Sequence, residues 1–212
     1  MKNLVLLIFL FPVIAFAQYN PGTVTLNDGS VKSGFIEIPE FQDSKLKFRS
    51  TEKASVEKLK VETVKEFEIT NREGQTEKFI TLKTARNRNL RDGFKINEEK
   101  SFLKIVKKNR IAIYIAHFKG TTTMGRASGG ISSQQFGGDK YFLQREGDDF
   151  AFSIGDHRYD LDFMTGMSTY AVIHENYKEI CPEFIEKLKQ ADLPVSRFGE
   201  FVDIYDTACP QK

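Results

Sequence analysis

The sequence predicts an α+β fold: an antiparallel β-sheet or partly closed β-barrel with a C-terminal helical tail. In residues 18–166, short apolar segments alternate with polar residues and are separated by turn sequences, as is typical of antiparallel strands. In residues 167–212, apolar residues recur at helical spacing. The chain has 212 residues, of which 40% are hydrophobic and 28% are charged. This is the composition of a globular protein that buries one core.

Residues 1–17 have the pattern of a secretory signal peptide. Lys2 precedes an apolar run from Leu4 to Ala15, and Ala15-Phe16-Ala17 gives an A-x-A cleavage motif before Gln18. The run is too short to cross about 30 Å of hydrocarbon, and Pro12 interrupts it. We therefore expect a soluble protein exported to the periplasm or the exterior, with no membrane span after cleavage. The expected divisions are a signal peptide at 1–17, a β-rich domain at 18–166, and helices at 167–212 that pack on the same domain.

Positive and negative charges are nearly balanced, with 31 Lys plus Arg against 29 Asp plus Glu. That balance implies neither nucleic acid nor an anionic membrane as a partner. The charges are nevertheless unevenly distributed, because residues 76–110 are mainly basic and residues 146–212 mainly acidic. Two interpretations remain open. Either these regions attract each other or face water, or a basic loop meets an anionic envelope component through Arg86, Arg88, Arg91 and Lys95.

The first strands are predicted by a turn and by strict alternation. Thr23–Leu26 and Val31–Ile38 flank Asn27-Asp28-Gly29-Ser30, in which Asp-Gly supplies the positive φ of a tight hairpin turn. The segment 45–49 alternates, so Leu46 and Phe48 should face a core while its three cations face water. This pattern predicts an outer or edge strand. Further short strands are expected at 59–61, 65–69 and 77–83.

Two more hairpins are predicted in the second half of the β-rich domain. The first joins Phe102–Val106 to Ile111–Ala116, and the second joins Tyr141–Arg145 to Phe150–Ile154 through a turn at Gly147. The polar stretch 84–100 has little apolar periodicity and predicts a loop. The stretch 119–139 holds six glycines and many hydroxyl residues, which predicts a flexible connection.

The tail predicts helices and contains both cysteines. Helices at 182–191 and 197–208 would form an antiparallel hairpin whose open ends are Cys181 and Cys209. A disulfide between them is expected in an oxidising compartment. The alternative is a pair of small buried thiols. A catalytic cysteine is less favoured, because His174 is the one histidine near either cysteine in the sequence.

No strong catalytic or phosphate-binding motif is present in the sequence, and we expect no cofactor. The densest polar cluster spans Asp156 to Asp162. Within it, His157, Asp160 and Asp162 could bind a divalent metal or share a proton. The alternative is that these residues simply form a turn after a strand.

Several segments together resemble exported, signal-peptide-bearing β-rich proteins of Bacteroidota whose function is not established. They are Phe16-Ala17-Gln18, Gly22-x-Val24-x-Leu26-Asn27-Asp28-Gly29 followed by Gly34, the hairpin from Phe102 to Tyr114, and Cys181-Pro182-Glu183-Phe184-Ile185-Glu186-Lys187-Leu188 followed by Ile204-Tyr205. The resemblance implies a Gram-negative envelope or extracellular location. It carries no activity and no site residues.

These observations favour a non-enzymatic exported protein that binds another envelope component, either an envelope protein or an anionic glycan. Long polar loops displayed on hairpins motivate this expectation, because binding surfaces usually lie on such loops. The alternative is a metal-dependent or hydrolytic enzyme that uses the 156–162 cluster. A purely structural role is the third hypothesis.

Overall fold

The computed structural model describes residues 19–87, 93–125, 131–159, 164–165 and 169–209. The predicted signal peptide and the positions Arg88, Arg91, Asp160 and Asp162 lie outside these residues. The strands are β1 (Tyr19–Leu26), β2 (Val31–Glu37), β3 (Lys45–Arg49), β4 (Glu57–Lys60), β5 (Val64–Thr70), β6 (Thr76–Asn87), β7 (Phe94–Lys108), β8 (Ala112–Gly125), β9 (Ile131–Gln144), β10 (Phe150–Arg158) and β11 (Met164–Thr165). The helices are α1 (Thr169–Tyr177), α2 (Pro182–Ala191) and α3 (Glu200–Ala208), with short 3-10 turns at Val61–Thr63 and Val195–Arg197.

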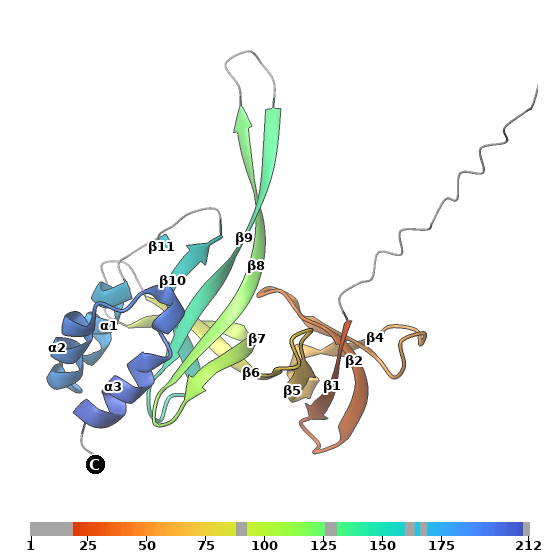
Figure 1. The fold of residues 1–212 in the computed structure, drawn as a ribbon, viewed down its shortest axis with the longest axis horizontal. Helices are drawn as coiled ribbons and strands as arrows, with labels where there is room; N and C mark the ends of the chain where they lie inside the picture. The colour runs from red at the N-terminus through yellow and green to blue at the C-terminus, as the bar shows by residue number, and fades with distance from the viewer. Residues whose placement is uncertain (1–18, 88–92, 126–130, 160–163, 166–168, 210–212) are drawn as a thin grey trace, which may run out of the picture.

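The fold is α+β, as the sequence predicts. In the described chain, the strands form one sheet in the order β11-β10-β9-β8-β7-β6-β5-β1-β2-β3-β4 (Figure 1). β10 also pairs with β6 in parallel, from Phe150 opposite Lys83 to Phe152 opposite Ala85. This pair closes β6 to β10 into a circuit of hydrogen-bonded strands. The sheet is therefore mixed: its described strand pairs are antiparallel except for this one parallel pair.

The first half, β1 to β5, builds its own core with β6 and β7. The predicted hairpin turn is confirmed, since Gly29 has a φ of 85° and the Asp28 carboxylate accepts a 2.9 Å hydrogen bond from the Ser30 amide. Leu46 and Phe48 of β3 are buried, also as predicted. β3 is not an edge strand, because β4 covers its outer side. In this core the Phe67 and Phe79 rings stack with centres 4.5 Å apart.

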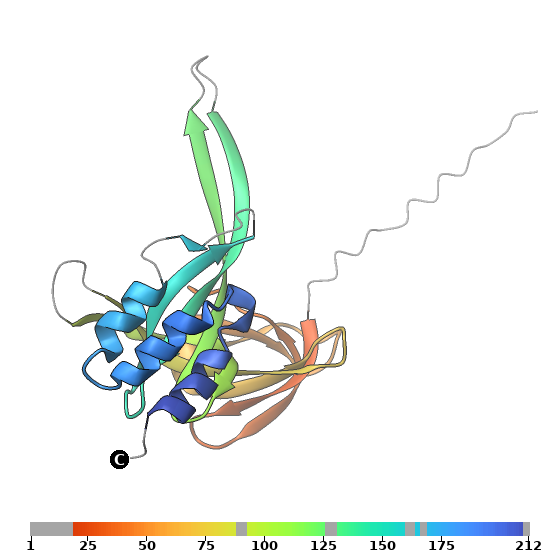
Figure 2. The ribbon, with the colours of Figure 1, turned by 60° about the vertical axis from the view of Figure 1, so that its left-hand side comes forward.

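The second half, β6 to β10, has an apolar interior and a helix-covered outer face. Tyr114, Phe142 and Leu103 belong to the interior cluster. On the other face, Ile113, Leu143 and Phe152 pack against helix residues that include Phe184 and Tyr205. Figures 1 and 2 show the three helices gathered on this side of β8, β9 and β10.

Both polar stretches that were predicted to be loops contain paired strands. β6 continues to Asn87 and β7 begins at Phe94, with Arg86 opposite Lys95. In the described part of 84–100, residues 84–87 and 94–100 are thus strand. Thr84 and Ala85 are almost fully buried. The loop prediction failed because a tertiary neighbour, the parallel strand β10, supplies burial that periodicity within the segment does not reveal.

The larger correction concerns the glycine-rich stretch 119–139, which was predicted to be a flexible connection. β8 and β9 pair continuously from Ala112 opposite Gln144 to Gly125 opposite Ile131, and they form an arm that projects from the body (Figure 1). The glycines near its root lie under aromatic rings. A Cβ at Gly120 would come within 2.4 Å of the Phe136 ring, and one at Gly138 within 2.8 Å of the Phe118 ring. Aromatic cover of this kind compensates for the weak strand preference of glycine.

The disulfide Cys181–Cys209 is present, with a Cα to Cα distance of 5.9 Å. It joins the residue before α2 to the residue after α3, as the helical hairpin predicts.

Residues of the basic region 76–110 contact the acidic region 146–212. The Lys107 ammonium lies 2.6 Å from the Asp203 carboxylate, and the Arg110 guanidinium lies 2.8 Å from the Glu146 carboxylate. Part of the uneven charge distribution is therefore satisfied within the fold.

Candidate functional site

A groove with a volume of about 720 Å³ lies at the root of the arm. One wall is the connection Ile38–Glu40, which follows β2. The other wall combines residues 117–121 of β8, residues 135–138 of β9, and Tyr159 at the end of β10. The volume falls within the range of about 300–1,000 Å³ that is usual for small-molecule sites.

The connection after β2 is fixed against β8 by backbone and side-chain contacts. The Phe41 amide donates a 2.7 Å hydrogen bond to the His117 carbonyl. The Phe41 ring lies 5.3 Å from that of Phe142. Across the groove, the Lys119 ammonium lies 2.6 Å from the Glu40 carboxylate. The N-terminal half of the protein thereby contributes one wall of a groove that is otherwise built by the second half.

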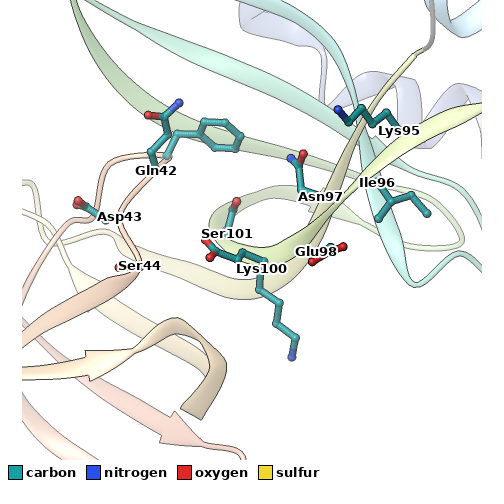
Figure 3. A pocket seen from close by; sticks show the side chains of 11 residues that line it. Gln42, Asp43, Ser44, Lys95, Ile96, Asn97, Glu98, Lys100 and Ser101 are labelled. Carbon is teal, nitrogen blue, oxygen red and sulfur yellow. The ribbon is translucent and has the colours of Figure 1, made fainter.

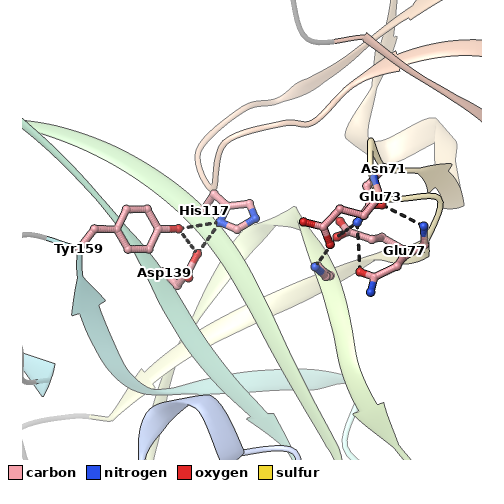
Figure 4. Close-up of polar contacts among 8 residues, drawn as sticks. Asn71, Glu73, Glu77, His117, Asp139 and Tyr159 are labelled. Carbon is pink, nitrogen blue, oxygen red and sulfur yellow. Dashed lines mark hydrogen bonds and ion pairs between the residues drawn. The ribbon is translucent and has the colours of Figure 1, made fainter.

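Three polar side chains meet at one end of the groove: His117, Asp139 and Tyr159 (Figure 4). His117 on β8 lies directly opposite Asp139 on β9, so both side chains lie on the same face of the sheet. The His117 Nδ1 atom contacts the Asp139 carboxylate. The Tyr159 hydroxyl donates a 2.9 Å hydrogen bond to the same carboxylate oxygen, and lies 3.2 Å from His117 Nδ1.

The Asp139 carboxylate is the buried centre of this cluster, and the residue is only 9% exposed. Burial alone would raise its pKa. The hydrogen bond and charge of His117, the hydrogen bond from Tyr159 and the charge of His157 outweigh burial and lower the pKa of Asp139 below its ordinary value. Burial, followed by the hydrogen bond to Asp139, raises the pKa of Tyr159. Tyr159 is therefore a neutral donor, and Asp139 is a charged acceptor.

Because the Asp139 carboxylate can only accept, its contact with His117 places a proton on Nδ1. The Nε2 atom points away from Asp139 and Tyr159 (Figure 4). This nitrogen can exchange a hydrogen bond with a ligand. The cluster thus offers one ring nitrogen and one exposed aromatic ring, both held in place by a buried carboxylate.

No protein-family model, curated protein or solved structure matches this chain. The function must therefore be inferred from the chemistry of its own residues. In the part of the chain that the structure describes, none of the helices combines the length and the apolar character needed to cross a membrane.

The predicted basic loop is only partly described. Arg86 and Lys95 face each other on β6 and β7 and are both exposed, while Arg88 and Arg91 lie outside the described residues. Beside Lys95 there is a second pocket, with a volume of about 650 Å³ (Figure 3). Its lining includes the carboxylates of Asp43, Glu98 and Glu99 and the ammonium groups of Lys95 and Lys100. This balance of charge does not favour an anionic ligand in that pocket.

The predicted metal or proton-transfer cluster also remains a prediction. His157 lies on β10, half-buried and directly opposite Asp139. Asp160 and Asp162 fall outside the described residues, so their approach to His157 is not defined. Among the residues that are described, no group of three or more His, Cys, Asp or Glu side chains is arranged to hold a metal ion.

Sequence reasoning missed the cluster of His117, Asp139 and Tyr159 because it treated 119–139 as a flexible connection. The signal was present in the two flanking segments. A hairpin whose pairs are symmetric about position 128 places His117 opposite Asp139. The position of Tyr159 could not be found in this way, because it depends on the pairing of β10 with β9 and on the bond from the Tyr159 amide to the Gly137 carbonyl.

We expect Asp139→Asn to lower the free energy of unfolding by about 1–3 kcal/mol near neutral pH, since two donors lose a charged acceptor. A carboxyl whose pKa is lowered by folding stabilises the protein above its unfolded pKa of about 3.8, and this contribution disappears as the pH falls through the lower folded value. The difference between wild type and variant, measured by chemical denaturation, should therefore be full above about pH 5 and shrink toward pH 2. Asp203→Asn removes an exposed ion-pair partner of Lys107 and should cost less than about 1 kcal/mol. A pH-independent difference for Asp139→Asn would contradict the assignment.

Proposed function

We propose that this is an exported binding protein of the cell envelope, and that the groove at the root of the arm holds a neutral glycan. Export is supported by the signal-peptide pattern of residues 1–17 and by the disulfide, which suits an oxidising compartment. The choice of ligand class rests on the groove.

The observation that carries the proposal is the exposed but fixed ring of Tyr159. Tyr159 is 61% exposed, yet its hydroxyl is hydrogen-bonded to Asp139 and its ring lies against Gly137, where a Cβ would be 3.4 Å away. A large aromatic side chain that is already ordered loses little conformational entropy on binding. The C–H faces of a sugar ring pack on such an aromatic surface, and sugar hydroxyls need neighbouring hydrogen-bonding groups.

The charges around the groove favour a neutral sugar over an anionic one. Glu40 pairs with Lys119, and Asp139 with His117, so the charged groups of the lining have partners within the protein. The polar groups that line it, such as His117, Thr121 and Gln135, suit the exchange of hydrogen bonds with hydroxyls. The proposal therefore favours a neutral glycan over the anionic glycan that the basic region suggested.

We expect Tyr159→Ala to weaken binding of a neutral oligosaccharide by about 10-fold or more, because truncating an aromatic anchor commonly costs at least this much affinity. The probes are cellohexaose, maltohexaose and mannohexaose, with oligogalacturonate as an anionic comparison. Binding to mature protein labelled with ¹⁵N is followed through the amide signals of Gly120, Gly137 and Gly138, which line the groove. The matched control is Val31→Ala, since Val31 is equally exposed but lies on β2.

The outcomes separate the hypotheses. A neutral oligosaccharide that shifts the three glycine signals, with affinity lost in Tyr159→Ala and kept in Val31→Ala, supports the proposal. Absence of binding to every probe, binding that Tyr159→Ala does not change, or preference for oligogalacturonate contradicts it. Appearance of shortened sugars in the same samples would instead support the alternative of a hydrolytic enzyme.

A further inference from the structure

The outer part of the arm is a two-stranded ribbon. β7 pairs with β8 only as far as Lys104 opposite Ile115. β10 pairs with β9 as far as Arg158 opposite Gly138, followed by the bond from the Tyr159 amide to the Gly137 carbonyl. Beyond these points, β8 and β9 pair only with each other among the described strands, out to Gly125 opposite Ile131. Figure 2 shows this ribbon standing clear of the body.

A ribbon of this kind presents two rows of backbone donors and acceptors. Natural proteins usually protect such edges with charged residues, proline or very short strands. The other end of this sheet follows the rule, since β4 has the four-residue sequence Glu-Lys-Leu-Lys. The arm does not. Residues 120–125 and 131–137 contain neither a charged residue nor a proline, and an isolated two-stranded hairpin is marginally stable in water.

The outer edge of β8 already accepts one backbone hydrogen bond, at His117. The His117 carbonyl receives its hydrogen bond from the Phe41 amide, on the side of β8 that faces away from β9. Backbone groups alternate in direction along an antiparallel strand. Residues 119, 121 and 123 therefore present their amide and carbonyl groups on the same outer side.

We propose that two copies of this chain pair through their arms, with the β8 edge of one antiparallel to the β8 edge of the other. Two-fold pairing is self-complementary, because every donor of one edge meets an acceptor of its copy. With the two-fold axis at Thr121, no like charges meet, because Lys119 of one copy lies opposite Thr123 of the other and residues 120–125 carry no charge. The arm points away from the body (Figure 1), so antiparallel pairing places the two bodies at opposite ends of the paired arms. The result is a four-stranded sheet that bridges two protomers. The pairing rests on the strand edge and not on the ligand of the groove, although both use Thr121.

The test is the mass of the mature protein in solution, measured by sedimentation velocity over a concentration series up to the solubility limit. The wild type should shift from monomer to dimer with increasing concentration. Thr121→Pro removes an outward amide donor from each copy, and Thr121→Lys places two ammonium groups near each other across the two-fold axis. Each should weaken the dimer by about 10- to 100-fold. Thr207→Lys, on the exposed side of α3, is the matched control and should dimerise like the wild type.

Amide hydrogen exchange also shows where the two copies pair, since the Thr121 amide should become protected as the dimer forms. The lysine variant keeps the test valid if the proline variant does not fold. A wild-type protein that remains monomeric throughout would overturn the proposal. So would a dimer whose stability neither Thr121 variant changes, or a dimer in which the Thr121 amide exchanges as it does in the monomer.

Discussion

Replacing Cys181 and Cys209 together by serine should lower the free energy of unfolding by about 3–4 kcal/mol, which corresponds to a fall in Tm of roughly 6–16 °C. The disulfide joins residues separated by 28 positions. In the chain-entropy model, closing a loop of that length restricts the unfolded chain by about this amount. Both cysteines are buried in the cluster that joins the helices to β8, β9 and β10, so the tether acts where the helices meet the sheet.

Thermal unfolding of the mature protein, with and without reductant, is the measurement. Reduced and alkylated wild type is a second route to the same open chain, and its Tm should fall in the same direction as that of the double serine variant. Reduction should have no effect on the variant itself. Equal Tm values for the oxidised wild type and the double variant would show that the tether does not stabilise the fold.

The local elements that the sequence predicts best are those whose signals lie within a few residues. The turn at Gly29, the alternation around Leu46 and Phe48, and the helix that begins at Pro182 all follow from local rules of conformation and burial. The disulfide followed from the same reasoning, because two short helices that pack antiparallel bring their open ends together.

The candidate site could not be predicted from the sequence in the same way, because it depends on pairing between distant residues. Asp139 is bonded to His117 on the preceding strand, β8, and to Tyr159, which follows the next strand, β10. The groove also needs the connection at Ile38–Glu40, which comes from the other half of the protein. Composition marked the region between positions 119 and 139 as flexible, whereas the cross-strand contacts of Phe118 and Phe136 with glycine make it a strand pair.

The closed circuit of β6 to β10 also supports the groove. Its interior residue Phe142 should be essential for the stability of the protein and for the shape of the groove. Phe142 is 2% exposed, and its ring lies 5.3 Å from that of Phe41. We expect Phe142→Ala to lower the free energy of unfolding by about 3–5 kcal/mol, through lost burial and the cavity left behind. Because Phe41 loses its packing partner, the groove wall at Ile38–Glu40 should loosen as well.

Native-state hydrogen exchange of the Phe41 amide, which is bonded to the His117 carbonyl, reports on that wall directly. The matched control is Phe67→Ala, which removes a ring that is 1% exposed from the other core and should cost a similar amount of stability. Exchange at Phe41 should accelerate more in Phe142→Ala than in Phe67→Ala, after allowance for the loss of global stability. Equal acceleration in the two variants would mean that the wall is held by the overall fold rather than by the contact between Phe41 and Phe142.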